Sequence, residues 1–158
     1  MGTYPELDTL NLEELIACFN AHHKDKFIYY DVVAVRIREQ GKPGNHFLLN
    51  ALKTISDDDE VRLRALLVAL SFQPSRGGIE ALSRHYKKWF IDRLRFYLFD
   101  RRPHILSVAI EGLCRLKVKS EIDRILFLKD HPFVFVRESV VRYVANLYPE
   151  RALPILFE

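Results

Sequence analysis

The feature that most limits the fold of this chain is an internal repeat of its apolar pattern. A shift of 30 residues relates two sets of four positions: Leu106, Ile110, Leu113 and Cys114 fall on Val136, Val140, Tyr143 and Val144. The same shift places Ile125–Phe127 on an identical tripeptide, Ile155–Phe157. A shift of 45 residues places another set, Val61, Ala65, Val68 and Ala69, on the positions of 106–114. A recurring period of this size predicts stacked helix pairs that bury their apolar faces against neighbouring pairs.

Apolar residues recur at helical spacing through most of the chain, and no segment shows the alternation of a strand. We expect helices over about 11–23, 26–40, 45–55, 56–72, 79–100, 104–118, 121–129, 130–148 and 151–157. Three pairs of residues have the spacing of an N-terminal capping box: Asn11 with Glu14, Ser56 with Asp59, and Ser120 with Asp123. Gly41, Pro43 and Gly44 are expected to separate the second helix from the third. The fold class is therefore predicted to be all-α.

The repeated helices also resemble a known family. The run Asp59-Glu60-Val61-Arg62, followed by Ala65 and Ala69-Leu70, is similar to the core of HEAT and HEAT-like (phycobilisome-lyase-type) repeats. Pro132 with Val136-Arg137 resembles the variant that begins with proline, although three residues rather than one separate proline from valine. Ser107 stands where the family has its arginine, so a ladder of arginines would be interrupted there. The resemblance implies one domain over 1–158, an α-α superhelix of about four helix pairs, and is clearest over 56–157.

Composition excludes several other classes of protein. No run approaches the 18 consecutive apolar residues of a membrane span, and residues 1–8 lack the pattern of a secretory signal. Cys18 and Cys114 lie in no metal or redox spacing, so we expect buried thiols in a reducing compartment and a cytoplasmic protein. The histidines are scattered, and no phosphate loop or nucleophile–base arrangement is visible. We therefore predict no catalytic residue, cofactor or metal, and a role that is not enzymatic.

One stretch, 84–104, concentrates cations and aromatic rings. Residues 61–104 hold 10 basic and 3 acidic residues, whereas residues 1–60 hold 6 and 11. The shift of 45 exceeds the shift of 30 by 15 residues, and this extra length falls within the stretch. Extra length in a repeat array often lies on the binding face. The candidate partner-binding residues are Arg84, Lys87, Lys88, Trp89, Arg93, Arg95, Arg101 and Arg102.

A structural interpretation of the same stretch is an amphipathic helix that serves the core alone. Six residues would form its buried stripe: Leu82, Tyr86, Trp89, Phe90, Leu94 and Tyr97. Arg84, Lys88, Asp92 and Arg95 would form its solvated side, with Asp92 within reach of Lys88 and Arg95. Arg62 and Arg137 have two interpretations as well, either as partners of preceding acidic residues or as ligand contacts.

Three functions remain open on the sequence. The first is a scaffold or adaptor whose inner helices and basic stretch bind a protein, with an acidic surface expected on that partner. The second is a nucleic-acid binder that uses the same cations on phosphates. The third, implied by the resemblance alone, is a phycobilisome-lyase-like role in handling bilins or light-harvesting proteins. The apolar residues Leu153 and Ile155–Phe157 also indicate either a short cap helix or self-association.

Overall fold

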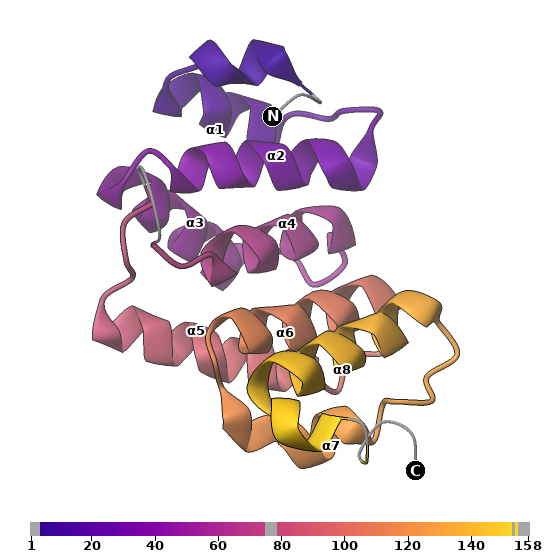
Figure 1. The fold of residues 1–158 in the computed structure, drawn as a ribbon. Helices are drawn as coiled ribbons and strands as arrows, with labels where there is room; N and C mark the ends of the chain where they lie inside the picture. The colour runs from indigo at the N-terminus through magenta and orange to yellow at the C-terminus, as the bar shows by residue number, and fades with distance from the viewer. Residues whose placement is uncertain (1–3, 75–78, 153, 155–158) are drawn as a thin grey trace. The chain divides into compact units, whose positions relative to one another are not determined.

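The computed structural model describes residues 4–74, 79–152 and 154, and all of the regular secondary structure within them is helical (Figure 1). The α-helices are α1 (Leu12–Asn20), α2 (Lys26–Arg38), α3 (Lys42–Thr54), α4 (Glu60–Ser71), α5 (Arg84–Tyr97), α6 (Pro103–Arg115), α7 (Ile122–Leu126) and α8 (Val134–Leu147). Three short 3-10 helices accompany them: η1 (Pro5–Thr9), η2 (Lys119–Glu121) and η3 (Pro149–Arg151). The described residues include no strand, which confirms the all-α prediction. The predicted helix at 151–157 lies largely outside the described residues.

The chain divides into two compact units, residues 1–83 and 84–158. In the first unit α2 packs along α4, α1 packs on α2, and α3 contacts both α2 and α4. The helix predicted from 56–72 does not bury the expected face as a whole, because Val61 and Val68 are only half-buried. Ala65 and Ala69 are buried, but so are four leucines outside that face: Leu63, Leu66, Leu67 and Leu70. Because α2 and α3 both pack on α4, most of its circumference lies in the core.

Two of the three predicted N-terminal capping boxes, at Asn11 and Ser56, lie in the first unit. Asn11 caps α1 as expected, because its side chain accepts from the Glu14 amide at 2.9 Å and its own amide donates to the Glu14 side chain at 2.9 Å. The Ser56 capping box is wrong, since α4 begins three residues later with Asp59 as its N-cap. Ser56 instead forms a turn, in which its carbonyl accepts from the Asp59 amide at 3.0 Å.

The start of α3 also differs from the prediction. We expected Gly41, Pro43 and Gly44 to break the chain and Asn45 to open the helix. The helix begins at Lys42 instead, with Pro43 in its first turn, where a missing amide costs nothing. Gly41 alone makes the break, with a φ of 81° that favours glycine. Gly44 lies inside the helix, and the close approach of the Ile37 backbone leaves no room for a side chain at this position.

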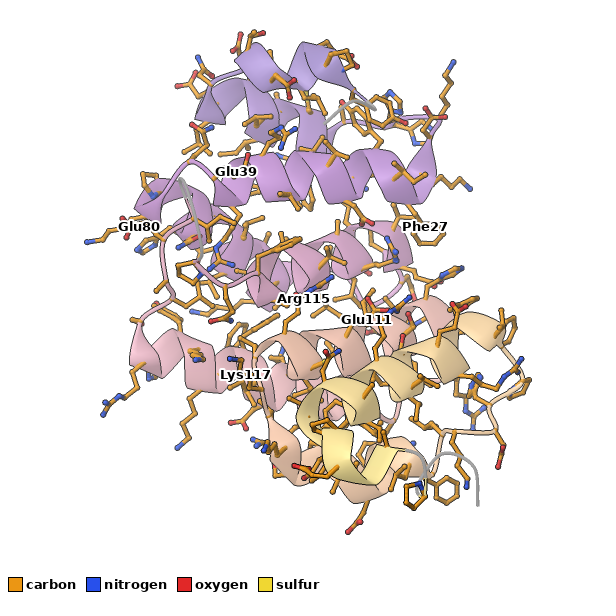
Figure 2. The ribbon with its side chains drawn as sticks, in the orientation of Figure 1. Phe27, Glu39, Glu80, Glu111, Arg115 and Lys117 are labelled. Carbon is orange, nitrogen blue, oxygen red and sulfur yellow. The ribbon has the colours of Figure 1, made fainter. Side chains whose placement is uncertain are left out.

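In the second unit α5 packs on α6, α6 packs along α8, and α7 contacts α8. The positions related by the shift of 30 form the contact between α6 and α8. Seven of these eight residues are buried, Cys114 being half-buried: Leu106, Ile110, Leu113, Val136, Val140, Tyr143 and Val144. Glu111 on α6 joins the same two helices, since it accepts from Ser139 at 2.9 Å and from Arg142 at 2.7 Å (Figure 2).

Three helix boundaries in this unit correct the sequence prediction. The helix expected over 79–100 is shorter, and α5 runs from Arg84 to Tyr97. Ser120 caps no helix, because its hydroxyl donates to the Glu121 carboxylate at 3.0 Å, and the chain forms η2 and the short α7 there. The last long helix begins at Val134, two residues after Pro132.

Candidate functional site

The basic and aromatic stretch 84–104 forms α5, a turn and the first residues of α6. One side of α5 belongs to the core, because Phe90, Leu94 and Tyr97 are buried and α5 packs on α6. Tyr86 and Trp89 are half-buried beside them. The opposite side carries exposed polar residues, as an amphipathic helix requires. The buried stripe predicted by the structural interpretation is therefore present in part, since Leu82 lies before the helix and is only half-buried.

Four of the eight candidate partner-binding residues present charge without an internal partner. Arg84, Lys88 and Arg101 are exposed, and Lys87 is half-buried. None of the four forms an ion pair or a hydrogen bond with another residue in the described parts of the chain. Their charges are therefore available to a partner, and three of these side chains reach well into solvent.

Arg95 is engaged within the second unit. It forms ion pairs with Asp92 at 2.8 Å and with Glu121 at 3.0 Å, and its third nitrogen donates to the Ser120 hydroxyl at 3.3 Å. The pair with Asp92 was expected from the spacing, whereas Glu121 and Ser120 come from a distant part of the sequence. Arg95 thus fastens η2 to α5, which makes it a structural residue as well as a surface cation.

Arg102 is engaged with Asp100 in the turn before α6. Its amide, its Nε and its Nη2 all donate to the Asp100 carboxylate at 2.9 Å. Burial alone would raise the pKa of Asp100, but these hydrogen bonds and the positive charge of Arg102 lower the pKa below its ordinary value. The Asp100 carboxyl is therefore ionised at neutral pH, and its bonds to Arg102 hold the turn before α6 in place.

The remaining two candidates, Trp89 and Arg93, pack on each other. The Arg93 guanidinium carbon lies 5.5 Å from the centre of the Trp89 ring and 6.0 Å from the centre of the Tyr97 ring. Contacts of this kind hold a cation over the electron-rich faces of aromatic rings. Since both rings lie on the partly buried side of α5, we assign Trp89 and Arg93 first to the packing of this helix.

The structure brings to the same unit an aromatic cluster that the sequence analysis missed. Phe96 lies in the last turn of α5, Phe99 lies two residues after the end of that helix, and Phe127 directly follows α7. Arg124 lies between two of these rings, with its guanidinium carbon 4.3 Å from the Phe99 ring centre and 5.6 Å from that of Phe127. Arg124 and Phe127 occur in a predicted apolar helix 25 residues away, so local spacing carried no signal of this contact.

The arginines of the repeat motif have different partners. Arg62 pairs with Asp59 at 3.0 Å, as expected for a helix-start arginine beside acidic residues, and it also donates to the carbonyls of Phe19 at 2.7 Å and Ala21 at 2.8 Å. Arg137 instead donates to two main-chain carbonyls, those of His131 at 2.7 Å and Pro132 at 3.1 Å. Both arginines therefore tie helix starts to neighbouring backbone.

The described part of the chain holds no group of three or more His, Cys, Asp or Glu residues that could bind a metal ion. Histidines make ring contacts instead: His23 stacks on Tyr29 with centres 3.6 Å apart, and His104 stacks on Phe135 at 4.8 Å. Cys18 and Cys114 are free, half-buried thiols. Burial raises the pKa of Cys114, which keeps it protonated and a poor nucleophile at neutral pH.

Two open hollows lie on the described surface. One, of about 470 Å³, is lined by residues of the first unit: Tyr4, Asp25, Lys26, Phe27 and Ile28. Tyr4 donates to Asp25 there at 2.6 Å, and this hydrogen bond raises the pKa of Tyr4 to about 12. The other, of about 350 Å³, is lined by Phe96, Phe99 and Asp100.

Among the described residues, none of the helices has the length and apolarity that crossing a bilayer requires. Comparison of the chain with models of protein families, with curated proteins and with solved structures found no match.

Proposed function

We propose that this chain is a HEAT-like repeat protein whose helices pair as α1/α2, α3/α4, α5/α6 and α7/α8. The proposal is supported by the packing within each unit. The second helices of successive pairs, α2 with α4 and α6 with α8, make the most extensive contacts, as we would expect if the pairs stack as repeats. In α6, Ser107 takes the place of the repeat arginine, so an arginine ladder cannot join α6 to α8. We propose that buried apolar side chains such as Ile110 and Val140 make this contact instead. Four stacked pairs would form the α-α superhelix that the repeat motif implies.

The function that we propose is non-enzymatic, that of a scaffold or adaptor which binds an acidic protein surface. The observation that carries it is the set of exposed cations without internal partners, Arg84, Lys88 and Arg101. Residues 84–158 hold 15 Lys and Arg residues against 9 Asp and Glu residues, a net charge of +6, whereas residues 1–83 carry −3. A one-sided charge of this kind steers an oppositely charged partner towards one part of a protein. The two free thiols fit a reducing, cytoplasmic setting.

The test is capture of partners from host lysate on the immobilised chain, with and without nuclease. The triple variant Arg84→Glu/Lys88→Glu/Arg101→Glu should lose the captured protein, because it reverses three exposed charges without breaking an internal pair. Its matched control, Lys24→Glu/Lys26→Glu/Lys42→Glu, makes the same change in net charge at exposed sites of the first unit. Equal capture by both variants would remove the basic stretch from the proposal.

Nucleic-acid binding is the second candidate, favoured by the alternation of cations with exposed rings along 84–104. Aromatic faces accept stacked bases while neighbouring cations contact phosphates. If nucleic acid were the ligand, nuclease would abolish capture. Affinity for an oligouridylate would also fall steeply with salt, with a slope set by the number of phosphate contacts. Retention of captured protein after nuclease treatment favours the adaptor.

A further inference from the structure

Three phenylalanines of the second unit are exposed, and Phe99 links the other two. Phe99 lines a hollow with Phe96, and Phe99 and Phe127 both contact Arg124. Phe96 is 64% exposed, Phe99 is 70% exposed and Phe127 is 78% exposed. Single exposed apolar residues are ordinary, but a group of large aromatic side chains is typical of interaction sites. We call these three residues and Arg124 the Arg124 patch. Phe96 and Phe99 come from the end of α5 and the turn after it, and Arg124 and Phe127 come from α7 and its C-cap, so the fold of the unit assembles the patch.

Arg124 is held in one orientation within this patch. Its Nε and Nη2 both donate to the carbonyl of Leu98, at 3.3 Å and 2.9 Å, and its guanidinium plane lies near the rings of Phe99 and Phe127. Its third nitrogen, Nη1, makes no hydrogen bond with a described residue and is not buried. Because the side chain is already ordered, a ligand that binds Nη1 loses little arginine entropy.

Phe99, which contacts Arg124, also forms one wall of a hollow that is apolar on two sides. Phe96 and Phe99 line it together with Asp100, and its volume of about 350 Å³ suits one aromatic or branched side chain with its backbone. The charge of Asp100 is neutralised by Arg102 through three hydrogen bonds. The hollow therefore presents the rings of Phe96 and Phe99 and the paired carboxylate of Asp100. One of these rings, Phe99, contacts Arg124, whose Nη1 has no hydrogen-bond acceptor among the described residues.

From this geometry we propose that the Arg124 patch is the docking site for an acidic peptide segment of the partner protein. A carboxylate of that segment accepts from Arg124 Nη1, and an adjacent aromatic or aliphatic side chain enters the hollow between Phe96 and Phe99. Exposed Arg101 lies next in sequence to Asp100 and adds a second unpaired cation for the flank of the peptide. This inference rests on the proposed adaptor function and names the chemistry of its partner.

The local balance of charge favours a peptide over a nucleic acid. Asp100 lines the hollow of the patch and is paired with Arg102, and Asp92 and Glu121 of the same unit are paired with Arg95. Asp123, which is exposed, adds a further carboxylate beside Arg124. A phosphate backbone needs a run of unpaired cations. The patch and its flank offer only Arg124 Nη1 and Arg101, which suit one or two carboxylates of a peptide. Aromatic residues and arginine with little net charge are instead typical of the centre of a protein interface.

The experiment uses a displayed library of random peptides selected on the full chain. Selection against the double variant Phe99→Ala/Phe127→Ala removes peptides that bind elsewhere. The enriched peptides should carry Asp or Glu next to Phe, Trp, Tyr or Leu. Fluorescence anisotropy of one labelled enriched peptide should then show that the double variant and Arg124→Gln bind it about tenfold or more weakly than the original chain, as for an interface anchor. Phe133→Ala, which removes another exposed ring of the same unit, should leave the affinity unchanged.

Several results would overturn the inference. They are a selection that enriches no peptide, winners without the acidic and apolar pair, and winners that bind the double variant as tightly as the original chain. Binding of a labelled oligouridylate that depends on Phe99 and Phe127, without peptide binding, would make the patch a base-stacking surface instead. Thermal unfolding of each variant verifies folding, and little change is expected because the truncated rings are mostly exposed.

The failure of this inference is distinguishable from failure of the adaptor function. If the double variant still captures the lysate partner while the charge reversal at Arg84, Lys88 and Arg101 abolishes capture, the Arg124 patch is not the docking site and the adaptor function stands. If no protein is captured but acidic peptides bind the patch, the docking chemistry stands without a scaffold role.

Discussion

The Nη2 atom of Arg38 donates to the main-chain carbonyl of Glu80 at 2.9 Å, across 42 residues of sequence, and Figure 2 labels Glu80 at this end of the first unit. The Nη1 atom of Arg38 donates to the carbonyl of Ala69 at 2.8 Å. Ala69 lies in the last turn of α4, where carbonyls lack partners within the helix. The side chain is 1% exposed, and burial lowers its pKa to about 10. Arg38 therefore stays charged and joins α2, the end of α4 and the segment before α5.

Replacing Arg38 by methionine should lower the free energy of unfolding by about 2 kcal/mol. Two hydrogen bonds from a charged donor are lost, and the Ala69 carbonyl keeps no side-chain donor, although relief from burying a charge offsets part of the cost. Urea unfolding measures the change. Arg36→Met on the same helix is the control, because its partners Asp8 and Glu39 are surface groups and its cost should stay below about 1 kcal/mol.

Replacing Gly44 by alanine should destabilise the first unit by about 3 kcal/mol, in the range of overpacked cores. An added Cβ would lie 1.9 Å from the carbonyl oxygen of Ile37, so α2 and α3 would have to separate. Thermal unfolding followed by circular dichroism gives the result. His46→Ala, at an exposed position of the same helix, should leave the midpoint nearly unchanged. A tolerated alanine at 44 would show that the two helices are not held at this spacing.

Two phenylalanines of α5 should differ strongly in how much stability the protein loses when each is replaced by alanine. Phe90 is fully buried, so Phe90→Ala should cost about 4 kcal/mol through lost apolar burial and the cavity that remains. Phe96 is mostly exposed, so Phe96→Ala should change stability by less than about 0.5 kcal/mol. Chemical denaturation of both variants tests the orientation of α5. Similar costs at the two positions would contradict it.

The pair of Asp100 and Arg102 should make stability depend on pH. The pKa of Asp100 is lowered in the folded chain, so its contribution is complete above the unfolded value near 3.9 and is lost as the pH falls through the folded pKa. At pH 7 Asp100→Asn should cost about 1.5 kcal/mol, the scale of a hydrogen bond to a charged group. Urea unfolding from pH 7 down to pH 3 should show the difference between the two proteins shrinking below about pH 4. A difference that stays constant with pH would exclude this role.

Local sequence patterns predicted some, but not all, of the features that local contacts decide. The Asn11 capping box forms because both of its partners lie within three residues. The same pattern fails at Ser120, because the hydroxyl bonds Glu121 and accepts from Arg95, which comes from 25 residues away. Tertiary partners thus replaced a local cap that the spacing allowed.

The start of α5 was missed for a related reason. Ile79 and Leu82 fit a helical stripe, but a helix through them would use the Glu80 carbonyl for its own backbone. That carbonyl instead accepts from Arg38 and from Asn45, at 2.9 Å and 3.1 Å. The candidate site shows the same limit, since the sequence predicted the exposed cations of α5 but not the contact of Arg124 with Phe99, which the fold creates.

Arg62 binds the end of α1 through the carbonyls of Phe19 and Ala21 while it pairs with Asp59 at the start of α4. One side chain thus spans segments about 40 residues apart in sequence. Neither segment can leave its native place without breaking this arginine's bonds to the other. Hydrogen exchange should accordingly report a single opening event for both segments, with matched rates at the tail of α1 and the head of α4, instead of fraying that begins at the N-terminal helix.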